Sequence, residues 1–294
     1  MSSPIVPPFT AETARIKVKT AQNLWNTRDP AKVALAYTPD TIWRNRTTFL
    51  KGREEVVGFL TQKWEKEHLY VLRKELFAFS DNKIAVQFFY EWNELADGTG
   101  QWYRTYGLED WTFDASGLMR KRQMSGNDLA ISHEERCICK ITLYLPVYSI
   151  NPLSLVPPFT AATARLKVKA GQNLWNTRDP AKIALAYTPD SIWRNRTTFV
   201  RGREEIVRFL EEKWKKEHFY VLRKELFAFT DNKIAVQFFD EWNESPDGMG
   251  QWYRTYGLED WTFDEAGLMR KRQMCGNDLP ISPEERQVLQ HFSA

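Results

Sequence analysis

A glutamate surrounded by arginines and aromatic residues is the feature of this sequence best suited to chemistry. The stretch QWYRTYGLEDWTFD occupies residues 101–114 and returns unchanged at residues 251–264. It contains Arg104 and Glu109, and Arg122 follows in the stretch RKR. A carboxylate on an apolar wall has a raised pKa and can act as a general acid or base near neutral pH, whereas an adjacent arginine lowers that pKa and favours a permanent ion pair. Proton transfer by Glu109 and a structural ion pair, with Arg122 as the favoured partner, are therefore two interpretations of the same residues.

The alternation of side chains expected for a strand is broken around Glu109. Glu109 shares one face with two aromatic residues that need burial, while Arg104 and Tyr106 have the opposite parity. Gly107 lies between the two sets, where a β-bulge could switch the parity and turn Arg104 and Tyr106 inward as well. We therefore predict a kinked strand that wraps around a cavity.

A neighbouring strand supplies an apolar stripe. The alternate residues of the run 84–92, which include Phe88, Tyr90 and Trp92, share the more apolar face, so we place them inward. In the second half of the chain Asp240 stands where Tyr90 stands in the first. We therefore expect the two pockets to differ, the first preferring a more apolar or anionic ligand and the second a more polar or cationic one.

The first strand of each half contributes a tryptophan and an asparagine. Trp43 and Asn45 share one face, while Arg44 and Arg46 share the other. Burying two arginines costs more free energy than burying one asparagine, so we place Trp43 and Asn45 inward.

Together these strands define the candidate sites in the two halves. The candidate catalytic residues are Glu109, Arg122, Asn45, Glu259, Arg272 and Asn195. The candidate ligand-binding residues are Trp43, Phe88, Tyr90, Trp92, Arg104, Tyr106, Trp111 and Met124, with Trp193, Phe238, Asp240, Trp242, Arg254, Tyr256, Trp261 and Met274.

The elements that must position these residues occur twice. Shifting the chain by 150 residues aligns residues 6–136 with residues 156–286 without a gap, and 24 of the 131 aligned positions differ. This length indicates a duplicated domain rather than a solenoid repeat. We predict domains at residues 1–136 and 156–294, joined by an apolar, β-branched linker at residues 137–155, which is either an extra strand or the product of joining two genes.

Within each half the pattern predicts two helices, a strand, a third helix and four strands. Thr10 is the expected N-cap of the first helix, and Asp29-Pro30 ends that helix and opens a short second one. Residues 52–68 form an amphipathic helix, and the four later strands are expected near residues 70–80, 83–94, 101–113 and 118–127. Helices followed by an antiparallel meander predict an α+β fold in which the sheet curls around the helices.

This order, with YTPDTIWRNRTTFLKG leading into the third helix, resembles the nuclear transport factor 2-like, or SnoaL-like, superfamily. The stretches WRNR, YEWN and RTYGLEDW resemble one uncharacterised branch of it, and the resemblance covers both halves. It implies two cones, each with three helices packed on a curved, mainly antiparallel sheet. It also implies a pocket on the concave face and dimerisation through the convex face, here between the two halves of one chain.

Ketosteroid-isomerase-like members of the superfamily offer a specific comparison. The resemblance places their catalytic base at Asn45, which cannot take a proton, and their oxyanion-hole acid at Glu109. Their tyrosine falls near Ala21 and Gly171, which have no hydroxyl group. Two of the three roles are missing, so we do not expect steroid-isomerase chemistry.

Composition and sequence motifs limit the partners, the localisation and the cofactors that we expect. The net charge is +3 with no basic block, so we expect no nucleic-acid partner. We find no secretory signal, and no apolar run approaches the roughly 18 residues of a membrane span, so we expect a cytoplasmic protein with reduced cysteines. Histidine spacing typical of a metal site and a glycine-rich phosphate loop are both lacking, so we expect neither a metal nor a cofactor.

Two functions fit these residues. The first is a small-molecule pocket protein, either a lyase or an isomerase, in which Glu109 moves protons and an arginine stabilises negative charge. The second is a non-enzymatic ligand-binding or dimerisation module in which the Glu-Arg pair is purely structural. A protonated Glu109 beside an open cavity favours the enzyme, whereas a filled cavity with a closed ion pair favours the module.

Overall fold

The computed structural model describes residues 5–136 and 155–287. The chain forms two compact units, residues 1–148 and 149–294. The predicted linker, apart from its last residue, lies outside the described residues.

The first unit contains α1 (Ala11–Asn26), α2 (Pro30–Ala34), β1 (Tyr37–Asn45), β2 (Thr48–Lys51), α3 (Gly52–Lys66), β3 (His68–Ser80), β4 (Lys83–Asn93), β5 (Trp102–Phe113) and β6 (Met119–Ile131). The second unit repeats this order as α4 (Ala161–Asn176), α5 (Pro180–Ala184), β7 (Tyr187–Asn195), β8 (Thr198–Arg201), α6 (Gly202–Trp214), β9 (His218–Thr230), β10 (Lys233–Asn243), β11 (Trp252–Phe263) and β12 (Met269–Ile281), followed by a short 3-10 turn at Pro283–Glu285.

The helix signals in the sequence are confirmed. Thr10 caps α1, because its side chain accepts a hydrogen bond from the backbone N–H of Thr13. Asp29 caps α2 in the same way, and Pro30 occupies the first turn. Short polar caps therefore set the positions of the first two helices.

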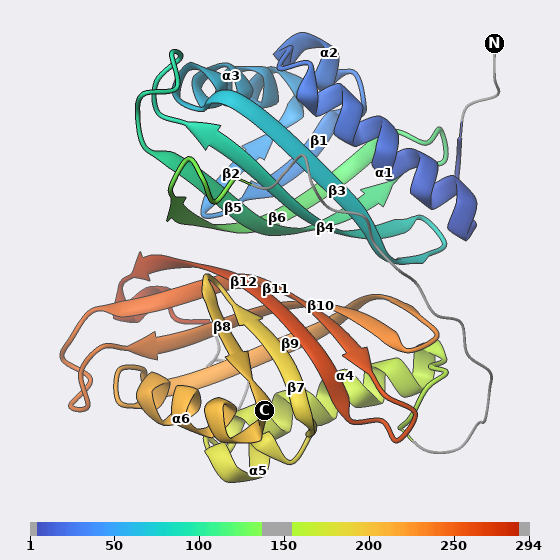
Figure 1. Ribbon diagram of the computed structural model, residues 1–294. Helices are drawn as coiled ribbons and strands as arrows, with labels where there is room; N and C mark the ends of the chain where they lie inside the picture. The colour runs from blue at the N-terminus through green and yellow to red at the C-terminus, as the bar shows by residue number, and fades with distance from the viewer. Residues whose placement is uncertain (1–4, 137–154, 288–294) are drawn as a thin grey trace. The chain divides into compact units, whose positions relative to one another are not determined.

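Each unit is built on one curved sheet of six strands. The strand order is β2-β1-β6-β5-β4-β3 in the first unit and β8-β7-β12-β11-β10-β9 in the second. All neighbouring strands are antiparallel except β1 with β6 and β7 with β12, which are parallel. Figure 1 shows that the helices of each unit lie on the concave side of its own sheet. The predicted α+β architecture, a curved and mainly antiparallel sheet around three helices, is confirmed.

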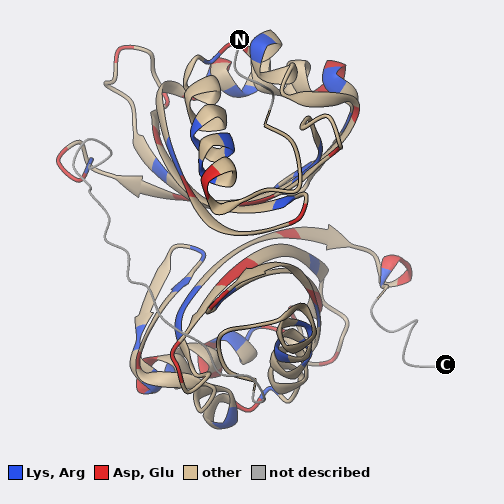
Figure 2. Ribbon diagram, turned by 90° about the vertical axis from the view of Figure 1, so that its right-hand side faces the viewer, with Lys and Arg blue, Asp and Glu red and all other residues tan. Residues whose placement is uncertain are grey.

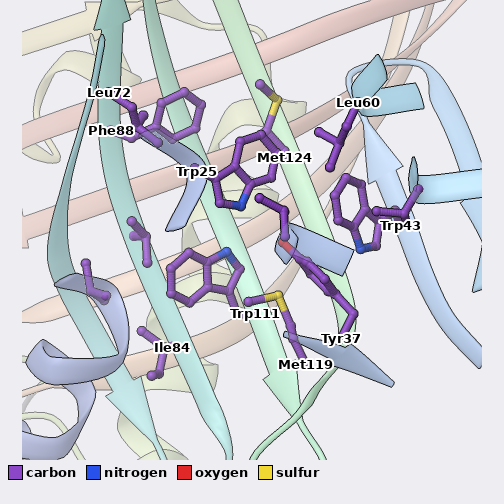
Figure 3. Packing of buried hydrophobic residues seen from close by; sticks show 14 of the residues in the cluster. Trp25, Tyr37, Trp43, Leu60, Leu72, Ile84, Phe88, Trp111, Met119 and Met124 are labelled. Carbon is purple, nitrogen blue, oxygen red and sulfur yellow. The ribbon is translucent and has the colours of Figure 1, made fainter. Parts of the chain in front are cut away.

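The curvature of the sheet creates an enclosed interior. Figure 2 shows each sheet curling around the helices of its unit, with basic and acidic segments interspersed along the chain. The core lies between the helices and the concave face, and Figure 3 shows Trp25, Phe88, Trp111 and Met124 gathered around the same space. The interior of each unit therefore combines aromatic rings with aliphatic and methionine side chains.

The predicted bulge at Gly107 is wrong. The register between β4 and β5 runs without a shift from Lys83 to Asn93, and Gly107 pairs with Phe88. A Cβ atom at Gly107 would lie 1.8 Å from the Phe88 ring. This glycine is required because the Phe88 ring occupies the place of a side chain here. Register shifts lie elsewhere, in β3 between His68 and Val71 and between Leu76 and Ala78, and in β5 between Thr112 and Phe113.

Membrane-spanning helices and metal-binding clusters were both considered from the sequence. No helix in the described part of the chain is long and apolar enough to cross a membrane. Among residues 5–136 and 155–287, no group of three or more His, Cys, Asp or Glu side chains is arranged to hold a metal ion.

Candidate functional site

A buried carboxylate lies at the centre of the first unit. Lys74 Nζ donates a hydrogen bond to Glu109 Oε2 at 2.5 Å, and Arg122 Nη2 donates to Glu109 Oε1. The indole N–H of Trp111 also donates to Glu109 Oε2, at 2.8 Å. Arg122 Nη1 donates to Asn45 Oδ1 at 3.0 Å. Glu109 therefore receives hydrogen bonds from three side chains, two of which carry a positive charge.

The register of the sheet explains why these side chains meet. Lys74 pairs with Phe88 across β3 and β4, and Phe88 pairs with Gly107 across β4 and β5, so the three residues form one row on the concave face. Glu109 is the next inward residue along β5, because inward residues recur every second position. Gly107 has no side chain, which leaves room for Lys74 to reach Glu109 above the Phe88 ring.

Arg122 is held between strands β1 and β5. It pairs with Trp43 in the parallel ladder on one side and with Trp111 in the antiparallel ladder on the other. Its guanidinium carbon lies 4.6 Å from the centre of the Trp43 ring and 4.8 Å from that of Trp25. Contact with these rings supplements the ion pair to Glu109 through cation–π attraction.

The lysine has a similar aromatic surrounding. Lys74 Nζ lies 4.9 Å from the centre of the Phe88 ring, 5.3 Å from that of Trp111 and 5.4 Å from that of Trp25. Only 1% of the Lys74 side chain is exposed, and only 2% of Glu109. The charges of Lys74 and Glu109 are thus shielded from water, and each charge is stabilised by the other.

The charges of the cluster determine which group can move a proton. Burial alone would raise the pKa of Glu109, but the neighbouring Arg122 and Lys74 outweigh burial and lower the pKa to about 2. Burial lowers the pKa of Lys74 to about 8, with the charge of Arg122 acting in the same direction and that of Glu109 opposing it. Glu109 is therefore ionised near neutral pH, and the protonated form that an acid role requires is not populated. The amine of Lys74 is the group of this cluster that titrates near neutrality.

A second set of polar side chains closes the cavity on the side of α3. Lys63 Nζ lies 2.5 Å from Glu67 Oε2 and donates to Tyr90 Oη at 3.0 Å. The side chains of Lys63 and Glu67 are 10% and 16% exposed, compared with 1–2% for the ion pairs at the centre. We call Lys63, Glu67 and Tyr90 the rim, because here the interior comes closest to solvent.

Little free space remains inside. The cavity is lined by Trp25, Asn45, Lys63, Tyr70, Leu72, Lys74, Phe88, Tyr90, Glu109, Arg122 and Met124, and its volume is about 10 Å³. That space holds about one water molecule. Any larger ligand must displace side chains, and Lys63 is the most exposed of the residues that line the cavity.

The structure brings together most of the residues chosen from the sequence. Asn45, Phe88, Tyr90, Glu109, Arg122 and Met124 line the cavity. Trp43 and Trp111 are buried directly behind the ion pairs. Trp92 stacks on Tyr103 with ring centres 4.5 Å apart and is outside the cavity lining.

Arg104 and Tyr106 do not join the site, and their predicted inward orientation is wrong. Without a bulge at Gly107 they remain on the face of β5 that points away from the cavity. Arg104 instead forms an ion pair with its cross-strand neighbour Glu91, with Nε 3.0 Å from the carboxylate. In the second unit Arg254 pairs with Glu241 in the same way, and Tyr256 occupies the position of Tyr106.

Sequence reasoning also missed several residues, above all Lys74. The signal was present, because Lys74 shares the alternation of Tyr70 and Leu72, which are both buried. Arg46 was placed on the outer face, but its φ of 56° turns the chain at the end of β1. Arg46 Nη2 then reaches Asp128, at 2.6 Å.

The second unit repeats the cluster. Glu259 accepts hydrogen bonds from Lys224 and Arg272, and from Trp261 Nε1 at 2.8 Å. Arg272 Nη1 donates to Asn195 Oδ1 at 3.0 Å. The pKa values shift in the same directions, that of Glu259 to about 2 and that of Lys224 to about 8. The positions of Trp193, Phe238 and Met274 correspond to Trp43, Phe88 and Met124, and Trp242 stacks on Tyr253 as Trp92 does on Tyr103.

Comparisons with known proteins identify the family but no activity. The family model described as "Protein of unknown function (DUF1348)" matches residues 7–139 and again residues 157–289. No curated protein matches the chain. Among solved structures, a hexachlorocyclohexane dehydrochlorinase (LinA) Type2 has 15% sequence identity and a TM-score of 0.35, covering 42% of this chain and 90% of that chain. The epoxide hydrolase/cyclase-like enzyme SalBIII has 13% identity and a TM-score of 0.35, covering 39% of this chain and 91% of that chain.

Proposed function

We propose that this chain, which belongs to the DUF1348 family, binds one small molecule with a polar end in each of its two units, and that the molecule bound by the first unit is an anion. The observation that carries the proposal is the charge of the central cluster. Lys74 and Arg122 are both 1% exposed and share a single carboxylate, that of Glu109. A buried charge without a partner costs several kcal/mol, so the cluster gains stability when an anion enters.

The cluster has hydrogen-bond donors that such a ligand can use. Arg122 Nε is buried and has no hydrogen-bond partner among the described residues, so one guanidinium donor remains available. Lys74 has three N–H donors, one of which is used by Glu109. A carboxylate or enolate fits these donors, because charge-assisted hydrogen bonds to oxygen anions are the strongest that lysine and arginine form.

The walls of the cavity indicate the rest of the ligand. Trp25, Tyr70 and Phe88 line it with aromatic rings, and Leu72 and Met124 are apolar. A flat apolar body attached to the anionic group would contact these rings. The ligand enters at the rim, where Lys63 and Glu67 move aside because their side chains, at 10% and 16% exposure, reach solvent.

If a reaction takes place, we assign the proton transfer to Lys74 rather than to Glu109. A neutral Lys74 amine removes a proton from a carbon next to a carbonyl group, and the electron pair moves to the carbonyl oxygen, which Arg122 stabilises as an enolate. The ammonium then returns the proton at the same or a neighbouring carbon. This is the isomerase form of the proposal. In it Glu109 stays ionised and positions both cations.

A non-enzymatic ligand-binding or association module is the second candidate. It is favoured by the closed ion pairs of Glu109 and by the cavity volume of about 10 Å³. In that case the cluster would be a structural core. A ligand-binding measurement separates the proposed function from an association module that binds no ligand, and it can be made before any turnover is known.

The test uses the full chain and a pair of isosteric probes. Benzoate carries the proposed anion, and benzamide has the same shape without the charge. We expect wild-type protein to bind benzoate and the double variant Lys74→Met, Lys224→Met to bind it about tenfold to a hundredfold more weakly, the effect of one lost charge-assisted hydrogen bond. The matched control is Lys32→Met, Lys182→Met, because Lys32 and Lys182 are exposed. Wild-type protein that binds no benzoate, or a variant that binds it unchanged, would rule out this function.

A further inference from the structure

One position distinguishes the cavity lining of the first unit from the equivalent residues of the second unit. Of the eleven residues that line the cavity of the first unit, ten are identical at the equivalent positions of the second, and only Tyr90 is changed, to Asp240. All other differences between the repeats lie outside the cavity lining. A difference in ligand between the two units would therefore arise first at this position.

In the first unit Tyr90 completes the aromatic wall. Its ring centre lies 4.7 Å from that of Tyr70 and 6.0 Å from that of Phe88, on which it stacks. Its hydroxyl oxygen accepts a hydrogen bond from Lys63 at 3.0 Å. The residue adds an apolar surface to the interior and no charge.

In the second unit Asp240 leaves an unused acceptor in the same place. Its side chain is buried, with 3% exposure, although an aspartate alone in an apolar interior is strongly disfavoured. Tyr220 Oη lies 3.5 Å from Asp240 Oδ2, a long contact, and Asp240 Oδ1 has no hydrogen-bond partner among the described residues. A ligand that donates a hydrogen bond would satisfy this oxygen.

The substitution also changes the balance of charge. The first unit has three cations around the cavity, Lys63, Lys74 and Arg122, and two carboxylates, Glu67 and Glu109. The second unit has the equivalent three cations, and an ionised Asp240 adds a third carboxylate to Glu217 and Glu259. The positive charge that attracts an anion in the first unit is thereby cancelled in the second.

We propose that this position decides which ligand each unit accepts: the first binds a monoanion, and the second binds a neutral molecule whose polar end donates a hydrogen bond to Asp240. A carboxylic acid anion and the matching carboxamide represent the two classes. The inference rests on the proposed function, because it assigns ligands to the same two cavities.

The titration of Asp240 supplies a way to test this assignment. Burial raises the pKa of Asp240 to about 7, with Lys213 lowering it, Glu217 raising it, the nearby Thr255 hydroxyl lowering it, and Asp278 raising it. The other charged or titratable groups near it are Tyr220 and Lys224 on β9, Glu259 on β11, Arg272 on β12, and Arg196, which pairs with Asp278. When Asp240 takes up a proton, the second cavity regains its positive charge and accepts an anion as well.

Titration calorimetry of the full chain with benzoate counts the sites. We expect one benzoate site per chain at about pH 8 and two at about pH 5.5, because the affinity of the second site rises about tenfold as Asp240 is protonated. Benzamide is expected to bind the second site at about pH 8. The isosteric variant Asp240→Asn, which carries no charge at any pH, is expected to show two benzoate sites at both pH values. Tyr90→Asp is expected to lose the remaining site at about pH 8, and the control Leu95→Asp, which adds a carboxylate at an exposed position outside the cavity lining, to keep it.

The outcomes separate this inference from the proposed function. Two equivalent benzoate sites in wild-type protein at about pH 8 would overturn the inference and leave the proposed function standing. A single site that remains single in Asp240→Asn would also overturn it, and this variant has the shape of the native residue. The absence of any benzoate site at either pH would reject the proposed function itself.

Discussion

Lys74 and Glu109 meet at 2.5 Å although they belong to strands β3 and β5, which are not neighbours in the sheet. The contact bridges β4 at the point where Phe88 lies across Gly107. A single ion pair thus joins the two sides of the concave face. Its loss would affect both the candidate site and the stability of the unit.

The carboxylate is expected to be essential for stability. Replacing Glu109 and Glu259 with glutamine leaves two buried cations without a partner in each unit, which typically costs about 3–5 kcal/mol. We expect chemical denaturation to show this loss of the free energy of unfolding. The addition of Lys74→Met and Lys224→Met should restore part of it, since one cation per unit is removed. Glu75 is exposed on the same strand as Lys74, so Glu75→Gln is the control and should have little effect.

Acid should destabilise both units within a defined pH range. The pKa of Glu109 and that of Glu259 are lowered from 4.5 to about 2 in the folded chain. An acid with a lowered folded-state pKa contributes stability that is fully present above its unfolded pKa and is lost as the pH falls toward the folded pKa. The free energy of unfolding should therefore fall between about pH 4.5 and pH 2, and the glutamine variants should lack this part of the profile. A profile of the same steepness in wild type and variants would show that these residues are not responsible.

The ionisation of Asp240 should change the free energy of unfolding with pH in the opposite direction. Its pKa is raised from 3.8 to about 7, so the folded chain binds more protons than the unfolded chain between these values. The free energy of unfolding of the second unit should therefore decrease as the pH rises from about 4 to about 7. Denaturation of Asp240→Asn across this range is the measurement, and the variant should be less sensitive to pH than wild type. Tyr90→Phe, at the equivalent position, should follow the wild-type profile.

Gly107 should tolerate no side chain. In Gly107→Ala the new Cβ atom would collide with the Phe88 ring, and overpacking of this kind typically costs about 1–3 kcal/mol or more. Combining Gly107→Ala with Phe88→Leu should reduce the cost, which thermal unfolding can measure. The contrasting variant is Gly58→Ala in α3, where the added methyl group meets no atom within 4 Å and should stabilise the helix. Equal effects at the two glycines would contradict the packing role of Gly107.

The association of the two units stays a prediction. The resemblance to nuclear transport factor 2-like proteins implies contact through the convex sheet faces, and Phe89 pairs with Tyr106 on the outward side of β4 and β5. We expect small-angle scattering of the full chain to show one compact particle. Scattering from two separated lobes would argue against association.

The helices and strands were predictable because their signals are local. Thr10 and Asp29 mark helix starts by their own chemistry, and the apolar alternation of β4 identifies its buried face. The partner of Glu109 was predictable only in part. Arg122 lies on the adjacent strand, whereas Lys74 depends on the register across two strand pairs and on the space above Gly107. The strand register and the space above Gly107 depend on tertiary packing. In the sequence, a glycine at a packing contact looks the same as a glycine at a bulge.

Trp111 and Lys74 donate to the same oxygen of Glu109. The emission colour of an indole follows the electric field across its ring, and here a carboxylate and an ammonium lie beside the ring. The anion binding proposed above would change the surroundings of both groups. We therefore expect the emission of Trp111 to respond to a ligand in the first unit, and that of Trp261 to a ligand in the second. Light emitted by the unlabelled protein can report the filling of the cavities, with Trp111→Phe and Trp261→Phe separating the two signals.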